Sequence, residues 1–174
     1  MRVAGYCVMP NHFHLLLWPR HDGDLGRWMQ WVMTSHVRRH HRRHGGSGHV
    51  WQGRFKAFPV QGDGHFLTVL RYVERNPLRA GLAATAEAWE WSSLRWWGSA
   101  ERPAFLTEGP AERPEGWVGV VDEPMSEREL ESLRRSVNRG TPFGDPGWVG
   151  RIARRLGLES TLRPRGRPRK EAKK

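Results

Sequence analysis

Two histidines near the start of the chain have the spacing of a metal-binding pair. His12 and His14 flank Phe13 and precede an apolar run, residues 15–17. Successive side chains of a β-strand point to opposite faces, so a strand here would project both imidazoles from one face. Each neutral imidazole offers a nitrogen lone pair to a divalent metal ion. The alternative for so short a pattern is structural, with His12 in a turn and His14 half-buried and hydrogen-bonded.

A tyrosine and an asparagine about sixty residues later form a second candidate pair. Tyr72 and Asn76 lie in residues 64–76, whose apolar positions recur with helical spacing. At about 100° per residue, the two side chains share one stripe beside the buried face. Pro77 disfavours helical backbone at the preceding residue, so we expect the helix to end at Asn76 with its side chain free. Burial of Tyr72 in the core is the alternative.

The elements before this helix follow from local patterns. Residues 2–8 and 12–18 read as strands joined by a turn with proline and asparagine, which predicts a hairpin. Asp24 can cap a helix whose apolar residues are spaced by three and four. Toward its end this helix carries four arginines: Arg38, Arg39, Arg42 and Arg43. Three histidines, at 36, 40 and 44, could hold a metal ion there, but among arginines they favour a basic surface.

Residues 50–60 alternate aromatic and basic side chains in a pattern typical of a strand. Arg54 and Lys56 could then form a platform for phosphates and bases together with the aromatic rings. An ordinary edge strand is the alternative.

The second half of the chain changes in character. Residues 99–125 are rich in proline and glycine and are interpreted as a linker. A capping box at Ser126 and an Asp145-Pro146 start predict two helices, which form an accessory unit over residues 126–158. This unit could resemble a helix-turn-helix or close the fold as a plain helical hairpin. Residues 159–174 form a basic tail that resembles an AT-hook, expected to be disordered without DNA, and the alternative is a generic basic tail.

Composition narrows the class of partner. The 174 residues carry 29 Lys and Arg against 18 Asp and Glu, a formal net charge of +11. This excess favours a polyanionic partner, nucleic acid before a membrane surface, because no apolar run is long enough to span a bilayer. Cys7 is the sole cysteine, which excludes a disulfide framework, and no signal peptide is apparent. We therefore expect a cytoplasmic, nucleoid-associated protein.

Four motifs in this order resemble those of the REP-associated tyrosine transposases, which are single-tyrosine HUH nucleases. They are residues 9–16 (MPNHFHLL), 51–55 (WQGRF), 71–82 (RYVERNPLRAGL) and 91–93 (WSS). The resemblance implies an α+β, ferredoxin-like sandwich over residues 1–98, with the histidine strand central in an antiparallel sheet. Family members normally place a strand and a helix before this hairpin, so the sandwich is expected to be N-terminally incomplete, and full activity to need that segment.

The resemblance also implies a reaction. His12, His14 and Asn76 would hold Mg²⁺ or Mn²⁺, and Tyr72 would attack DNA to give a 5′-phosphotyrosine intermediate. Arg71, Arg75 and Arg79 are candidates for a positive field around the tyrosine; alternatively they are solvated or contact backbone phosphates, and this second interpretation is favoured for Arg79. The expected partner is a single-stranded hairpin of a repetitive palindromic element, bound by a monomer or homodimer. The alternative is a relative that binds DNA but has lost the chemistry.

The expected DNA contacts are Arg38, Arg39, Arg42, Arg43, Arg54, Lys56, Arg71, Arg75, Arg165, Arg167 and Arg169.

Overall fold

The chain begins with an antiparallel hairpin. The structure, a computed structural model, describes residues 1–164. Strands β1 (Arg2–Val8) and β2 (Phe13–Trp18) pair with Cys7 opposite His14. The turn between them is closed by a 2.8 Å hydrogen bond from the Met9 amide to the His12 carbonyl. The predicted hairpin is therefore confirmed. The AT-hook-like prediction and Arg165, Arg167 and Arg169 lie outside the described residues.

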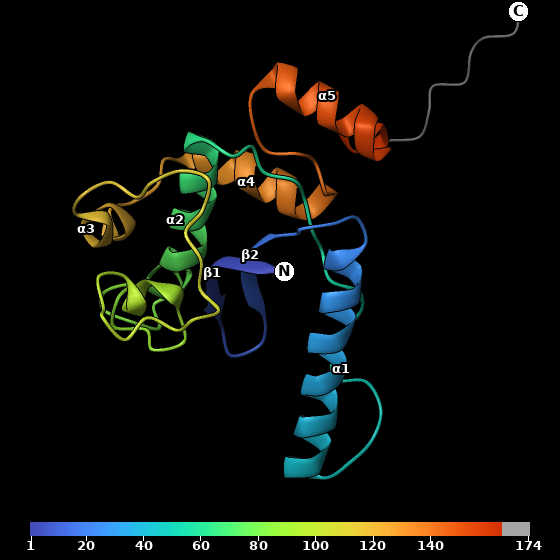
Figure 1. Cartoon of the computed structure of the whole chain (residues 1–174), viewed down its shortest axis with the longest axis vertical. Coiled ribbons are helices and arrows are strands. Elements are labelled where there is room, and N and C mark those ends of the chain that lie inside the picture. The colour runs from blue at the N-terminus through green and yellow to red at the C-terminus, as the bar shows by residue number, and fades with distance from the viewer. Residues whose placement is uncertain (165–174) are drawn as a thin grey trace, which may run out of the picture.

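Helix α2 (Gly64–Arg79) covers one face of this hairpin (Figure 1). Its buried residues include Phe66, Val69, Leu70 and Val73, as the apolar spacing predicts. The packing is close at Gly5, where an added Cβ would lie 2.4 Å from the Leu70 side chain. Only glycine therefore allows α2 to approach β1 this closely.

The predicted end of α2 at Asn76 is wrong, because the helix continues through Pro77 to Arg79. Proline has no N–H and cannot bond to the carbonyl four residues before it, here that of Val73. The Asn76 side chain supplies donors in its place: Nδ2 lies 2.7 Å from the Tyr72 carbonyl and 3.5 Å from that of Val73. The asparagine thus helps the helix to pass the proline.

Helix α1 (Asp24–His44) extends away from the rest of the chain (Figure 1). Trp51 links this helix to the hairpin, and its Nε1 donates to the Met33 carbonyl at 3.3 Å. The Trp51 ring also packs on Phe13 and His36, with centroids 5.3 and 4.8 Å away. The expected strand over residues 50–60 is absent: the segment forms turns and loop, with one isolated bridge at Val60. Its tryptophan packs against α1 and β2 instead of lying in a sheet.

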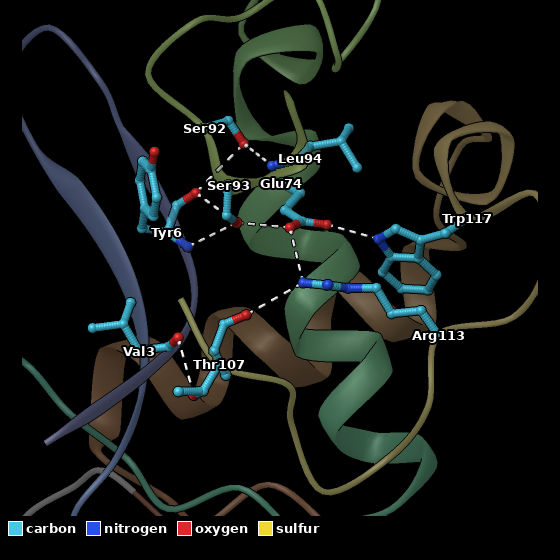
Figure 2. Close-up of polar contacts among 10 residues, drawn as sticks. Val3, Tyr6, Glu74, Ser92, Ser93, Leu94, Thr107, Arg113 and Trp117 are labelled. Atoms are coloured by element: carbon cyan, nitrogen blue, oxygen red, sulfur yellow. Dashed lines mark hydrogen bonds and ion pairs between the residues drawn. The ribbon is translucent and has the colours of Figure 1, made fainter. Parts of the chain in front are cut away.

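A buried carboxylate joins α2 to the hairpin and to the following segments (Figure 2). Glu74 accepts hydrogen bonds from Ser93 Oγ (2.7 Å) and Trp117 Nε1 (2.8 Å), and Arg113 lies 3.4 Å away. Ser93 Oγ in turn accepts a hydrogen bond of 2.9 Å from the backbone amide of Tyr6 in β1. Burial raises the pKa of Glu74, whereas the Arg113 charge and the two hydrogen bonds act in the opposite direction.

Residues 99–125, expected to be a linker, pack into the core. They contain helix α3 (Trp117–Asp122), and Trp117, Val121 and Met125 join the same buried cluster as α2. Leu106 forms a parallel bridge with Val3 of β1. The proline- and glycine-rich composition correctly indicated irregular backbone. It did not indicate that the widely spaced apolar residues of this segment would be buried in the core.

The predicted accessory helices are present. Helix α4 (Glu127–Arg139) starts with the expected capping box at Ser126 and ends at Gly140. Helix α5 (Pro146–Leu156) follows Asp145 and ends at Gly157. Leu130 and Leu133 of α4 belong to the main core cluster, so this helix is part of the body. Two short 3₁₀ helices complete the described elements: η1 (Ser93–Trp96) and η2 (Glu159–Leu162).

The predicted α+β class with an antiparallel sheet is confirmed. Among residues 1–164, β2 pairs with β1 alone and so lies at an edge, where the resemblance implied a central strand. The other edge of β1 is covered by isolated bridges to Leu106 and Ser92. None of the helices in the described part has the length and apolar character needed to cross a membrane.

Removal of Arg113 tests the buried network. The side chains of Arg113 and Glu74 are 8% and 0% exposed, so Arg113→Met leaves a buried carboxylate without its counter-charge. We expect the free energy of unfolding, measured in urea, to fall by about 3–5 kcal/mol. The double variant Glu74→Gln/Arg113→Met should recover part of the loss, because it buries no charge.

Arg95→Met is the matched control, because Arg95 is exposed on η1. It should change the unfolding free energy by less than about 0.5 kcal/mol. A stability of Arg113→Met equal to that of Arg95→Met would contradict a structural role for the buried pair.

Candidate active site

The two predicted histidines lie side by side at the start of β2. Their ring centroids are 4.9 Å apart in an edge-to-face arrangement. His12 is exposed, and its Nδ1 lies 2.7 Å from Asn11 Oδ1. A hydrogen bond there fixes the ring and leaves Nε2 with its lone pair free to bind a ligand. The strand pattern therefore predicted the relative placement of the imidazoles, although it did not identify the role of Asn11.

His14 has the properties of a metal-binding imidazole. Its Nε2 is buried and has no hydrogen-bond partner within residues 1–164. The pKa of His14 is lowered to about 4, first by burial and then by the charges of His12 and Arg79. The ring is therefore neutral at pH 7, and a buried nitrogen without a partner is costly unless something binds it. The histidine pair fits a divalent cation.

Tyr72 of α2 lies against this pair. Its ring centroid is 5.8 Å from that of His14, again edge to face. The hydroxyl-bearing residue and the imidazoles come from different elements, and α2 brings them together by packing on the hairpin. Tyr72 is partly buried at the margin of the core rather than enclosed in it. The arrangement therefore brings a tyrosine next to a candidate cation site.

Asn76, one turn further along α2, is fully buried. Its Nδ2 is committed to the carbonyls of Tyr72 and Val73, which fixes the direction of the amide oxygen. That Oδ1 accepts a hydrogen bond from Arg79 Nη2 at 2.9 Å. An amide oxygen is a suitable ligand for Mg²⁺ or Mn²⁺, so the three side chains offer a mixed nitrogen and oxygen donor set.

Arg79 lies closer to Tyr72, His14 and Asn76 than its position in the sequence indicated. Its guanidinium carbon lies 5.8 Å from the Tyr72 ring centroid, and its charge lowers the pKa of His14. Together with the bond to Asn76, these contacts place one exposed cation next to all three residues. Sequence reasoning favoured a backbone-phosphate contact for Arg79, because the proximity to His14 depends on how α2 packs on the sheet.

Arg71 and Arg75 are bonded to the end of α3. Arg71 Nη2 donates to the carbonyls of Glu123 (2.8 Å) and Pro124 (3.2 Å). Arg75 Nη1 donates to the carbonyls of Val121 (2.9 Å) and Asp122. A guanidinium suits the negative end of a helix, so both arginines anchor α3 to α2. Their contribution to DNA contact or to the field at Tyr72 stays a prediction.

The other predicted DNA contacts lie on the surface. The side chains of Arg38, Arg39, Arg42 and Arg43 are exposed on α1, and those of Arg54 and Lys56 are exposed in the loop after it. The histidines at 36, 40 and 44 form a row beside these arginines, with ring centroids 6.1 and 4.8 Å apart. The predicted basic surface is therefore exposed as a whole.

The structure contains a further group of potential metal ligands that was not predicted from the sequence. Ligand atoms of Asp63, His65 and Asp145 all lie within 4.8 Å of one another. His65 Nδ1 is 2.8 Å from Asp63 Oδ1, and the Gln61 amide bonds to both carboxylates. These contacts join the starts of α2 and α5, which lie far apart in the chain. No short-range pattern links them.

Comparison with known proteins agrees with the motifs. Residues 1–76 match the family described as "Transposase IS200 like". The chain is 26% identical over 132 residues to a Haemophilus influenzae protein named "Putative REP-associated tyrosine transposase". That match covers 69% of this chain and 68% of the relative. No solved structure matches the chain significantly. The predicted resemblance is therefore confirmed.

The role of the Asn76 amide can be isolated by a double-mutant cycle with Pro77. Asn76→Ala removes the donors to the Tyr72 and Val73 carbonyls, and we expect a loss of about 1–3 kcal/mol in unfolding free energy. In the background of Pro77→Ala, a backbone N–H can bond to the Val73 carbonyl, so the same change should cost less. Equal costs in the two backgrounds would show that the amide does not compensate for the proline.

Proposed function

We propose that this chain, which resembles the IS200-like transposases, cleaves and rejoins single-stranded DNA through a covalent bond to Tyr72. The observation that carries the proposal is the contact between the Tyr72 and His14 rings, whose centroids are 5.8 Å apart. This contact supports a reaction at the Tyr72 hydroxyl, because His14 is neutral and, together with the neighbouring His12, suits a divalent cation. The similarity to transposases supports DNA transposition as the wider process.

In the proposed reaction the Tyr72 oxygen attacks the phosphorus of a DNA phosphodiester. The new bond joins this oxygen to phosphorus, and the bond from phosphorus to the 3′ oxygen breaks. The 3′ oxygen leaves as a hydroxyl after taking up a proton, and the 5′ phosphate remains on the tyrosine. A 3′-hydroxyl can later reverse these steps and release Tyr72. Because the covalent bond keeps the phosphoester, rejoining needs no external energy source.

His12, His14 and Asn76 would hold a Mg²⁺ or Mn²⁺ ion, which supplies Lewis-acid stabilisation of charge on the phosphate. Asn76 is oriented for this role by its two bonds to the α2 backbone. His12 is oriented by Asn11. The chain's own contribution is therefore a set of donors whose directions are fixed by hydrogen bonds.

Arg79 supplies the positive field that the tyrosine requires. A free tyrosine has a pKa near 10, so its hydroxyl reacts poorly at neutral pH without help. A guanidinium beside the ring attracts the phosphate and stabilises the negative charge that develops during the attack. Arginine has five N–H donors, so the bond to Asn76 leaves others for a phosphate oxygen.

The basic surface of α1 suits the DNA flanking the cleaved bond. Its exposed arginines follow one another along the last turns of a helix that extends from the body (Figure 1). Such a row neutralises successive phosphates and releases their counterions. We therefore assign α1 to strand binding rather than to the reaction.

A DNA-binding protein without the reaction is the second candidate. Asn76 Oδ1, the proposed third ligand atom, is bonded to the Arg79 guanidinium. A protein that kept this bond permanently would hold a cation only through the two histidines. Formation of a covalent adduct separates the two functions.

Tyr72→Phe should abolish adduct formation and keep DNA binding. The full chain is incubated with Mn²⁺ and a hairpin oligonucleotide labelled at its 3′ end, and the products are separated under denaturing conditions. We expect a labelled protein band from the wild-type chain and none above background from the Tyr72→Phe variant. Tyr6→Phe is the matched control, because Tyr6 lies on β1 and is the other tyrosine of the chain. A folded wild-type protein that binds the hairpin but forms no adduct would favour the second candidate.

Replacing Arg39, Arg42 and Arg43 by Gln should weaken DNA binding and its dependence on salt. For single strands, each lost phosphate contact lowers the slope of log affinity against log salt by about 0.7, so three should lower it by about 2. The measurement is fluorescence anisotropy over a salt series. The control replaces Arg151, Arg154 and Arg155, an equal charge exposed on α5. The same change in slope for both variants would contradict a specific role for α1.

A further inference from the structure

We propose that a pocket between α2 and α4 receives one base of the DNA strand and that Glu127 selects the base. The inference rests on the proposed function, because the pocket adjoins Tyr72. It assigns a role in substrate recognition to the chain that follows residue 98, which contributes none of the residues expected to carry the chemistry.

The pocket opens beside the proposed nucleophile. Its volume is about 210 Å³, enough for several water molecules at about 30 Å³ each. Tyr72, Arg75 and Arg79 of α2 line one side. Met125, Glu127 and Leu130, at the start of α4 and just before it, line the other. A nucleotide linked to a phosphate at Tyr72 therefore has this pocket within reach.

The wall formed by the start of α4 is held in place from both sides. Arg71 bonds to the carbonyls of Glu123 and Pro124, immediately before the pocket residues. Ser126 and Glu129 form the reciprocal capping box that fixes the first turn of α4. Leu130 is buried in the main core cluster. The pocket is thus bounded by packed elements on each side.

The chemistry of the lining suits a nucleobase. The partly exposed Tyr72 ring offers an apolar face to a planar base, and the exposed edges of the otherwise buried Met125 and Leu130 form the floor. The guanidinium of Arg79 at the rim attracts the phosphate that the base carries. A free phosphate would use the arginine but would gain nothing from the apolar wall and would be repelled by Glu127. A base attached to its phosphate uses all of these groups.

Glu127 gives the pocket a preference for particular bases. Its side chain is 83% exposed, and its ion pair with Arg134 is long, at 3.9 Å, so its oxygens are available to accept hydrogen bonds. Adenine, cytosine and guanine carry an exocyclic amino group that can donate to a carboxylate. Thymine has no amino group, and its one donor, the ring N3–H, lies between two carbonyl oxygens that repel a carboxylate. Glu127 therefore favours the amino-bearing bases and disfavours thymine.

The test scans the single-stranded flank of a labelled hairpin oligonucleotide one position at a time. Each position carries cytosine, adenine, guanine, thymine or an abasic site, and binding to the full-length Tyr72→Phe chain is measured by anisotropy. We expect one position at which thymine and the abasic site each weaken binding roughly tenfold relative to the preferred amino-bearing base. At the other positions the effect should be smaller.

Glu127→Gln should remove the discrimination against thymine at that position, because an amide can donate to the thymine carbonyl as well as accept. Glu131→Gln is the matched control, an exposed carboxylate on α4 that does not line the pocket. The Glu127→Gln variant should keep its fold, since position 127 is exposed. If this variant binds every oligonucleotide more tightly by the same factor, including the abasic ones, the proposal is overturned in favour of simple charge repulsion.

The base pocket and the strand-cleaving function can be contradicted independently of each other. Absence of base discrimination in the Tyr72→Phe chain, with a Tyr72 adduct formed by the wild-type chain, would overturn the base pocket alone. Discrimination that depends on Glu127 in a chain that forms no adduct would support the pocket and contradict the strand-cleaving function. If removal of the base weakens binding at none of the positions, the base pocket is overturned whatever the adduct experiment shows.

Discussion

The buried carboxylate of Glu74 is the interaction on which the arrangement of the site depends. It has no access to solvent, so it must be satisfied by the protein, and its partners come from segments that are distant in the sequence. Through Ser93 it reaches the backbone of β1. Because Glu74 lies between Tyr72 and Asn76 on α2, the same contacts that satisfy its charge restrict the position of the helix that carries both side chains.

The candidate site combines structural roles and proposed chemical roles in the same side chains. Asn76 supports a helix interrupted by proline and, by doing so, fixes the direction of its amide oxygen. His14 is neutral because it is buried, and the same burial leaves its Nε2 without a partner in the described part of the chain. Arg79 contacts the tyrosine and the asparagine together. A substitution at any of these positions therefore changes the local fold and the proposed chemistry at once, and stability must be measured beside activity.

The segment after residue 98 belongs to the body of the protein. Trp117 completes the shell around Glu74, and the start of α4 forms one wall of the pocket beside Tyr72. Arg71 and Arg75 tie the end of α3 to the helix that bears the proposed nucleophile. A chain cut after the hairpin and α2 would lose these contacts and expose a buried charge. The C-terminal half is thus a structural requirement of the candidate site.

Local patterns in the sequence determined the hairpin, the side-by-side placement of His12 and His14, and the starts of α4 and α5. Strand alternation, the capping box of α4 and the proline that begins α5 all act over a few residues. Tertiary structure alone decided that α2 passes Pro77, that residues 50–60 form a loop around Trp51, and that residues 99–125 enter the core. It also decided the proximity of Arg79 to His14 and the pocket at Glu127. These features depend on burial and on hydrogen bonds between segments that are tens of residues apart. Such contacts cannot be predicted from the periodicity of the sequence, which reflects only local structure.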